Sequence, residues 1–291
     1  METNAINRES RSERWRAYKR RPLSLLLRLA VTLSAAVTVF VLVTLVAYIL
    51  IKGIPNLKPS LFAWEYTTEN ASMLPAIINT LTMTVLSLLM AVPVGVCSAI
   101  YLVEYAGRGN RLVSLVRITA ETLQGIPSIV YGLFGFLFLV VACKFGYSLL
   151  SGAITLAIMI LPLILRTTEE ALKAVPDSFR EGSFGLGAGR LRTVFRIVLP
   201  SAVPGILGVI LAIGRIVGET AALIYTSGTV AGVPETLMGS GRTLAVHMYA
   251  LLSNGLYTEQ AYATAVVLLV MVVGINALSA WLAKKVSAKQ R

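Results

Sequence analysis

Charged residues and histidine are scarce in this sequence. Asp, Glu, Lys and Arg make up 14% of the 291 residues, whereas an average soluble domain contains about 25% charged residues. His247 is the one histidine, which leaves almost nothing for a histidine-based metal site or a Ser-His-Asp triad. We therefore expect no catalytic residue and no metal site, which argues against a membrane-embedded enzyme.

Cysteines and nucleotide-binding signatures are equally sparse. Cys97 and Cys143 both fall in apolar segments without a CxxC spacing, so we expect two small packing residues and no disulfide. The glycine-rich stretch GLGAGRL (185–191) lacks the Lys and Ser/Thr of GxxxxGK[ST], and the chain contains no such motif. We expect this chain itself to bind no cofactor.

Long apolar segments dominate the sequence instead. Hydrophobic residues make up 56% of the chain, and its mean hydropathy is +0.76. About 20 helical residues cross a bilayer core of about 30 Å. Six segments are long enough, near residues 28–51, 76–103, 118–143, 147–165, 203–227 and 261–283. We predict an all-α integral membrane protein with six transmembrane helices.

The basic residues are distributed unevenly between the loops. The formal charge is +12, and 21 of the 26 Lys and Arg lie in the two tails and in the second-to-third and fourth-to-fifth loops. With six spans these four segments share one side, and positive charge is retained in the cytoplasm. We therefore predict that both termini are cytoplasmic. The basic N-terminal tail (1–27) has few aromatic residues, so attraction to anionic lipid explains it and nucleic-acid binding does not.

The polar stretch at 166–200 is the longest within the membrane part. Two short helical patterns flank a glycine-rich break, and the second pattern resumes at Arg190. Ser178 and Glu181 have the spacing of a capping box. Long structured loops tend to be functional, so we predict a bent helical element that projects into the cytoplasm.

Two charged residues interrupt the fifth apolar segment, AIGRIVGETAAL (212–223). A charge at mid-bilayer costs about 2.5–3.5 kcal/mol on insertion scales. Arg215 and Glu219 are four residues apart, so one continuous helix would place them on one face as a structural ion pair, beside the GxxxG pattern of Gly214 and Gly218. Intramembrane charges usually line a pathway, and we favour that interpretation.

Glu121 is a further candidate for the pathway. It follows Arg117 by one helical turn and precedes a Gly-Ile-Pro break at 125–127. It either adds polarity to the pathway or is a charge at the cytoplasmic end of its helix.

A known signature lies in the cytoplasmic stretch. Membrane subunits of ABC importers carry Glu-Ala-Ala, three residues, Gly, nine residues, Ile, one residue and Leu-Pro. This chain has Glu181-Gly182-Ser183, then Gly187, then Ile197-Val198-Leu199-Pro200 at matching spacing, with small residues in place of both alanines. Further stretches, among them GIPSIVYGLFGF and IGRIVGETAAL, resemble the phosphate-specific importer, and the PstA-type subunit more than the PstC-type. The resemblance covers residues 74–283.

The resemblance implies a type I ABC importer permease fold in the bacterial inner membrane. It implies an external phosphate-binding protein (PstS-type), a second permease subunit (PstC-type) and two ATPase subunits (PstB-type) that hold ATP and Mg. The chain then divides into the tail 1–27, a first helix with an external loop at 28–73, the transmembrane domain 74–283 with its coupling loop 166–200, and the tail 284–291.

The resemblance also implies roles for individual residues. In the family, the short helix at this signature seats in a groove on the ATPase. The coupling residues would be Ser178, Glu181, Gly187, Leu199 and Pro200. Glu181 would pair with a basic residue or cap the docking helix, and Gly187 would permit a sharp turn. The arginine and glutamate that match Arg215 and Glu219 are linked with phosphate passage.

Two alternative functions remain open at this point. A permease for sulfate or molybdate would share the fold, although these dianions carry no proton that Glu219 could accept. A proton-coupled secondary anion carrier would use Glu121, Arg215 and Glu219 as a relay and would work without an ATPase.

Overall fold

A computed structural model describes residues 22–107, 109–206 and 210–288. Most of the N-terminal tail, the last three residues and residues 207–209 of the fifth predicted span lie outside the described residues. All regular elements of the described residues are helices, and these residues contain no strand. Its main helices are α2 (Pro22–Gly53), α3 (Leu74–Ile100), α4 (Arg111–Gln124), α5 (Ser128–Gly135), α6 (Leu149–Lys173), α7 (Asp177–Gly185), α8 (Arg190–Thr193), α9 (Leu199–Ile206), α10 (Ile210–Val217), α11 (Ala221–Thr226), α12 (Leu244–Ser253) and α13 (Thr258–Ala288).

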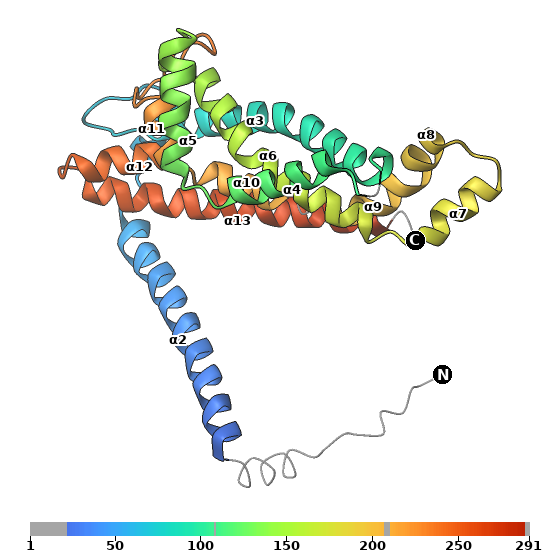
Figure 1. The fold of residues 1–291 in the computed structure, drawn as a ribbon. Helices are drawn as coiled ribbons and strands as arrows, with labels where there is room; N and C mark the ends of the chain where they lie inside the picture. Colours follow the sequence, from blue (N-terminus) through green and yellow to red (C-terminus); the bar gives the residue numbers. More distant parts are fainter. Residues whose placement is uncertain (1–21, 108, 207–209, 289–291) are drawn as a thin grey trace. The chain divides into compact units, whose positions relative to one another are not determined.

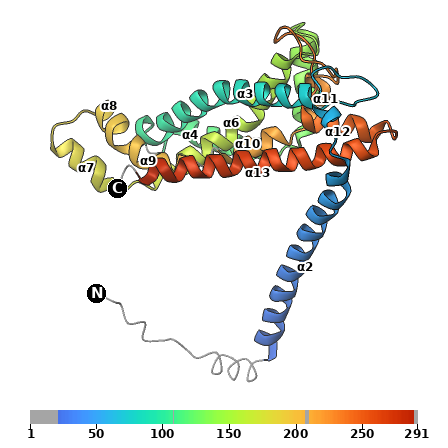
Figure 2. The same ribbon diagram turned by 180° about the vertical axis from the view of Figure 1, so that it is seen from behind.

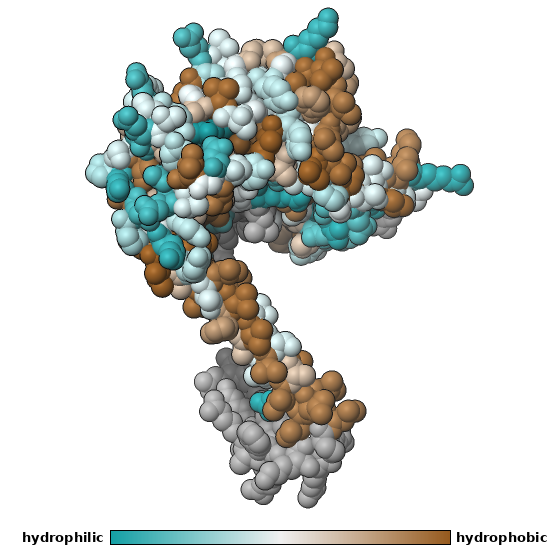
Figure 3. All heavy atoms as spheres, turned by 90° about the vertical axis from the view of Figure 1, so that its left-hand side faces the viewer, coloured by the Kyte–Doolittle hydropathy of each residue, from teal (hydrophilic) through white to brown (hydrophobic). Residues whose placement is uncertain are grey.

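The chain forms two compact units, residues 1–51 and 52–291. Helix α2 makes up the described part of the first unit. None of the residues in its most apolar window is buried within the chain, and Figure 3 shows apolar side chains along its surface. Such a surface needs lipid or another subunit around it.

Four predicted spans are continuous helices that are long and apolar enough to cross a membrane. They are α2, α3 together with its π-helical end Tyr101–Tyr105, α6 and α13. In the second unit, α3 and α6 pack closely against each other. A Cβ on Gly95 of α3 would lie 2.7 Å from a methyl group of Ile164 on α6, so the glycine permits this approach.

The predicted span at 118–143 is divided at the Gly-Ile-Pro break that the sequence indicates. Helix α4 ends at Gln124, and the chain bends by 103° before α5 and the π-helical turn Phe136–Ala142. Pro127 lies at the break and has no N–H to donate, which disrupts helical hydrogen bonding at this point. The hydroxyl of Tyr131 donates to the carbonyl of Leu123 at 2.8 Å and so links the two helices across the bend.

The prediction of one continuous helix at 203–227 is wrong. Helix α10 ends at Val217, and α11 begins at Ala221. The backbone N–H of Glu219 donates to the carbonyl of Ile216 at 3.1 Å. This bond spans three residues instead of four and so closes the last turn of α10. Helix α11 has 6 residues, too few to span a bilayer without the helices before it.

The two ends of the second unit differ in structure. In Figures 1 and 2, α7 and α8 lie at one end, and α12 lies at the opposite end. Between the last two predicted spans the chain forms the short helix α12 (Leu244–Ser253). Cys97 and Cys143 are both exposed on this chain, so neither packs against other residues of the chain as closely as a core residue does.

Candidate functional site

Each of the two interrupted spans continues after its break as a short helix, α5 in the third span and α11 in the fifth. Helices α5 and α11 are in extensive contact, and glycines permit their close approach. A Cβ on Gly132 would lie 2.7 Å from the Cα of Ala222, and one on Gly135 would lie 2.8 Å from a methyl group of Thr226. Non-helical backbone is tolerated at membrane depth where it is buried in protein or lines a polar cavity.

Glu219 lies in the second break, between α10 and α11. Its side chain is mostly buried, with 8% of the residue exposed, and its Oε1 accepts a hydrogen bond from the N–H of Ala222 at 3.2 Å. The carboxylate therefore caps the start of α11, where a negative charge also suits the helix dipole. The expectation that Arg215 and Glu219 share one helical face is wrong, because α10 ends before Glu219.

Arg215 lies on α10 with an exposed side chain. Within the described part of the chain it forms no hydrogen bond or ion pair, with Glu219 or with any other residue. Its charge does reach Tyr131, beside the α4–α5 bend. The preceding Gly214 faces α13, because a Cβ there would lie 3.4 Å from the side-chain amide of Asn276. Arg215 thus lies in the last turn of α10, next to the second break, and its side chain is exposed on this chain's surface.

Glu121 lies in the last turn of α4, just before the first break. Its Oε1 is 3.5 Å from Nη1 of Arg166 on α6, and the Glu121 side chain is 71% exposed. Arg117 does not pair with Glu121 as the one-turn spacing suggests, because its Nε lies 2.6 Å from Glu169. The exposed Glu121–Arg166 pair contributes little to stability. Glu121 is therefore one of two acidic residues that pair with arginines between α4 and α6, in the pairs Glu121–Arg166 and Arg117–Glu169.

The cytoplasmic stretch folds as the two short helices that the sequence predicts. Gly187 adopts a φ of +80°, a backbone conformation that favours glycine, and α8 begins at Arg190. The hydroxyls of Ser183 and Thr193 lie 2.8 Å apart and hold the two helices together. Leu199 packs against the small core beneath this element.

The capping box predicted for this stretch is absent. Helix α7 begins at Asp177, and no side chain caps it. Pro176 precedes the helix, and its carbonyl accepts the N–H of Phe179 at 3.1 Å. Ser178 and Glu181 are exposed on α7, and Glu181 has no hydrogen bond or ion pair among the described residues. Glu181 is therefore free to meet another protein.

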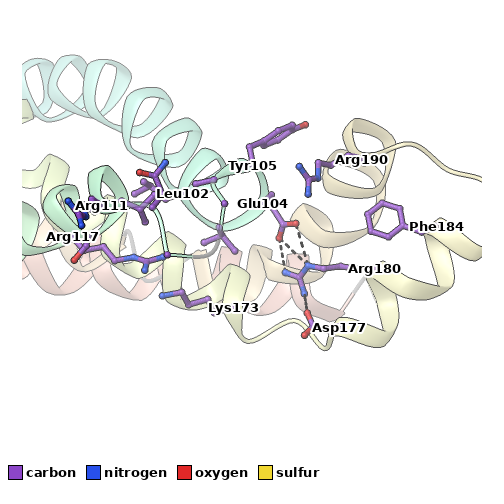
Figure 4. Close-up of a pocket in the computed structure, with 17 residues that line it drawn as sticks. Leu102, Glu104, Tyr105, Arg111, Arg117, Lys173, Asp177, Arg180, Phe184 and Arg190 are labelled. Atoms are coloured by element: carbon purple, nitrogen blue, oxygen red, sulfur yellow. Dashed lines mark hydrogen bonds and ion pairs between the residues drawn. The ribbon is translucent and has the colours of Figure 1, made fainter.

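Arg180 is the residue that the sequence reasoning missed. Figure 4 shows its guanidinium against Glu104, at the end of α3, and against Asp177. Nη2 lies 2.7 Å from Glu104, and the Arg180 side chain is 15% exposed. The same guanidinium donates to the carbonyls of Leu172 and Val175. The bond to Glu104 raises the pKa of Arg180, so the pair stays charged and ties α7 to α3.

A second buried cation lies at the opposite end of the unit. Arg242 is 6% exposed, and its guanidinium lies 4.6 Å from the centre of the Tyr66 ring. Asn79 donates to its backbone carbonyl at 3.2 Å. Burial, and then the charge of Arg242, lower the pKa of His247 to about 3. The imidazole is thus neutral at physiological pH, as expected for a packing residue.

Comparisons with known proteins agree with this architecture. Residues 91–290 match the family described as "Binding-protein-dependent transport system inner membrane component". The chain is 31% identical to "Probable ABC transporter permease protein YqgI" of Bacillus subtilis, over 88% of this chain and 94% of the relative. It is 37% identical to "Phosphate transport system permease protein PstA" of Yersinia pestis, over 78% of this chain and 77% of the relative.

Solved structures show the same fold at low sequence identity. A bacterial ABC transporter involved in the import of the acidic polysaccharide alginate matches with a TM-score of 0.62 at 18% identity, over 93% of this chain and 98% of that chain. The MetNI methionine ABC transporter in an inward-facing conformation matches with a TM-score of 0.57 at 21% identity, over 72% of this chain and 94% of that chain. The chain has the type I ABC importer permease fold, and it belongs to the family of binding-protein-dependent transport system inner membrane components.

Proposed function

We propose that the chain is a membrane-spanning permease subunit of an ATP-driven importer that carries inorganic phosphate into the cytoplasm. The observation that carries the proposal is its similarity, along most of its length, to relatives named as phosphate transport permeases. The importer fold supports the same assignment. The chain is an inner-membrane protein, as the family description states, and several of its described helices are long and apolar enough to cross the membrane.

In this proposal Arg215 supports the passage of the anion. Phosphate carries between one and two negative charges at neutral pH, because its second pKa is about 6. A guanidinium can hold two of its oxygens with a planar fork, and Arg215 is exposed and unpaired among the described residues. A fixed cation lowers the barrier for an anion in an apolar environment.

Glu219 then limits how tightly the anion is held. Glu219 follows Arg215 by four residues, and the N–H of Ala222 holds its carboxylate at the start of α11. A fixed negative charge close to the route weakens phosphate binding, and passage requires weak binding. Glu121 is a secondary candidate, because its charge is shared with Arg166.

A permease of this family works with ATPase subunits and a substrate-binding protein. We propose that the partners are a PstC-type permease, two PstB-type ATPases and an external PstS-type phosphate-binding protein. ATP and Mg belong to the ATPases in this proposal. The surface of α7 around Glu181 and the turn at Gly187 would seat on the ATPase, supported by their exposure at one end of the unit.

Reconstitution of the complete transporter in proteoliposomes tests this function. Uptake of radiolabelled phosphate should require ATP and the binding protein, and it should continue when a protonophore collapses the proton gradient. Equal concentrations of sulfate or molybdate should not compete. Uptake by the chain alone, driven by a proton gradient, would establish a secondary carrier instead, and competition by sulfate would establish a broader oxyanion importer.

A further inference from the structure

A cleft lies beside the coupling helices. It has a volume of about 1060 Å³ and lies between the end of α3, the first turns of α4 and α7. Figure 4 shows the side chains around it, including Arg111 and Arg117 from α4 and Lys173 from the end of α6. The coupling helices mark this end of the unit, which we expect to be cytoplasmic.

Positive charge exceeds negative charge around the cleft. Five cationic residues line it, and only Glu104 and Asp177 among its lining residues are acidic. Both of these carboxylates are held by Arg180. Arg117 and Lys173 share a single carboxylate, Glu169, each at 2.6 Å.

Arg111 has no partner at all within the described part of the chain. The α4 side of the cleft, formed by Arg111, Arg117 and Lys173, therefore carries three cations against the one carboxylate of Glu169. A bound anion would neutralise part of this excess positive charge.

An exposed apolar surface begins directly beside these cations. Leu115 and Ile118 follow Arg111 at four and seven residues, which places them on the same side of α4. They are 57% and 60% exposed. The first turn of α4 is thus cationic, and the following turns are apolar on the same side. This order matches a charged lipid headgroup followed by acyl chains.

We propose that this cleft binds the headgroup phosphate of an anionic phospholipid. Arg111, Arg117 and Lys173 hold the phosphate, and the acyl chains lie along Leu115 and Ile118. Basic pockets between helices on the cytoplasmic side bind such headgroups. A free phosphate ion would use the same cations, but it would leave the apolar side of α4 uncovered. The bound lipid braces the α3–α4 connection next to the Arg180–Glu104 pair.

Native mass spectrometry of the assembled transporter tests the proposal. The complex is exchanged into nanodiscs of phosphatidylcholine with or without phosphatidylglycerol, and retained lipid is measured for the wild type, Arg111→Gln and the double variant Arg111→Gln/Lys173→Gln. Arg192→Gln is the matched control, because Arg192 is an exposed cation on α8 that does not line this cleft. Each substitution in the cleft should weaken phosphatidylglycerol retention about fivefold, which corresponds to about 1 kcal/mol. The control should retain it fully.

Three results would overturn the proposal. The first is unchanged phosphatidylglycerol retention in a double variant that still copurifies with its ATPase and unfolds at the wild-type temperature. The second is displacement of the lipid by millimolar inorganic phosphate, lost in Arg111→Gln, which would identify a free-anion site. The third is efficient cross-linking of Leu115→Cys to the partner permease, which would identify a protein contact on this side of α4.

Discussion

Arg215 and Glu219 are close in sequence, but their side chains have different surroundings. Arg215 is exposed on α10, whereas Glu219 is mostly buried and caps α11. The glutamate thus has a structural contact that the arginine lacks. Substitutions at the two positions should therefore separate effects on transport from effects on folding.

Replacement of Arg215 by glutamine should abolish phosphate uptake, with a fall of at least about tenfold, equivalent to about 1.4 kcal/mol in the barrier. The transporter should still assemble, because Arg215 makes no hydrogen bond or ion pair within the described residues. Arg215→Lys should keep partial activity, since an ammonium carries the charge without the planar fork. Normal uptake by well-expressed Arg215→Gln would refute the pathway role.

Replacement of Glu219 by glutamine should preserve the fold, because the amide oxygen can still accept the N–H of Ala222. Glu219→Ala removes this acceptor and should lower the free energy of unfolding by about 1 kcal/mol. Thermal unfolding in detergent and phosphate uptake measure the two effects. If the glutamine variant is as unstable as the alanine variant, the negative charge and not the hydrogen bond stabilises α11.

At the scale of elements, the sequence predicts most helices but not how two of them are interrupted. The four long spans follow directly from apolar segments of about 20 residues or more. The turn at Gly187 and the start of α8 follow from local glycine signals. The break at Gly218–Thr220 contains no proline, and its surroundings are as apolar as a continuous span, so composition alone does not reveal it.

Contacts between distant segments explain the remaining differences. The Gly-Ile-Pro stretch indicates a break after α4, but the 103° angle of the bend and the packing of α5 against α11 are visible only in the structure. The Arg180–Glu104 pair joins residues 76 positions apart, and no local pattern predicts it. For the candidate pathway, the sequence identifies Arg215 and Glu219, but their separation by a helix end is visible only in the structure.

Substitution of Gly132 by alanine should force α5 and α11 apart. The added Cβ would lie 2.7 Å from the Cα of Ala222, a backbone atom that cannot easily move. We expect a loss of about 1–3 kcal/mol in the free energy of unfolding. Gly274→Ala in α13 is the control, because its Cβ would meet nothing within 4 Å, and it should be neutral or stabilising. Equal stability of both variants would contradict the close packing.

The Arg180–Glu104 pair should show strong coupling in a double-mutant cycle. Both side chains are largely buried, at 15% and 8% exposure, and removal of one partner of a buried pair typically costs about 3–5 kcal/mol. Arg180→Gln and Glu104→Gln should each destabilise the transporter and lower its ATPase activity. The double variant should lose less than the sum of the two, whereas strict additivity would show that the contact contributes nothing.

At the scale of the whole molecule, charge and structure give the chain two distinct ends. The coupling helices lie at one end, and α12 lies at the other (Figure 1). Positive charge in the loops predicts that the coupling end is cytoplasmic. The family assignment agrees with a chain that works in the membrane as one component of a binding-protein-dependent transporter.

Labelling with a membrane-impermeant thiol reagent tests this orientation. Leu186 and Leu256 are 91% and 82% exposed and lie at the coupling end and the opposite end. In a Cys97→Ser/Cys143→Ser background, Leu186→Cys should react only in inside-out vesicles, and Leu256→Cys should react only in intact spheroplasts. The opposite pattern would place the termini outside. The double serine variant is the control for background labelling.

Helix α3 is fastened at both of its ends. Glu104, just beyond its last turn, holds Arg180 of the coupling helix at 2.7 Å. At its start, Asn79 donates to the carbonyl of Gly232 at 3.0 Å, and the hydroxyl of Thr80 accepts the N–H of Leu244 at 2.8 Å. If the ATPase docks on α7 as proposed, a displacement of α7 would be transmitted through α3 to the distant loop before α12, by a route that does not include the interrupted helices that carry Arg215 and Glu219.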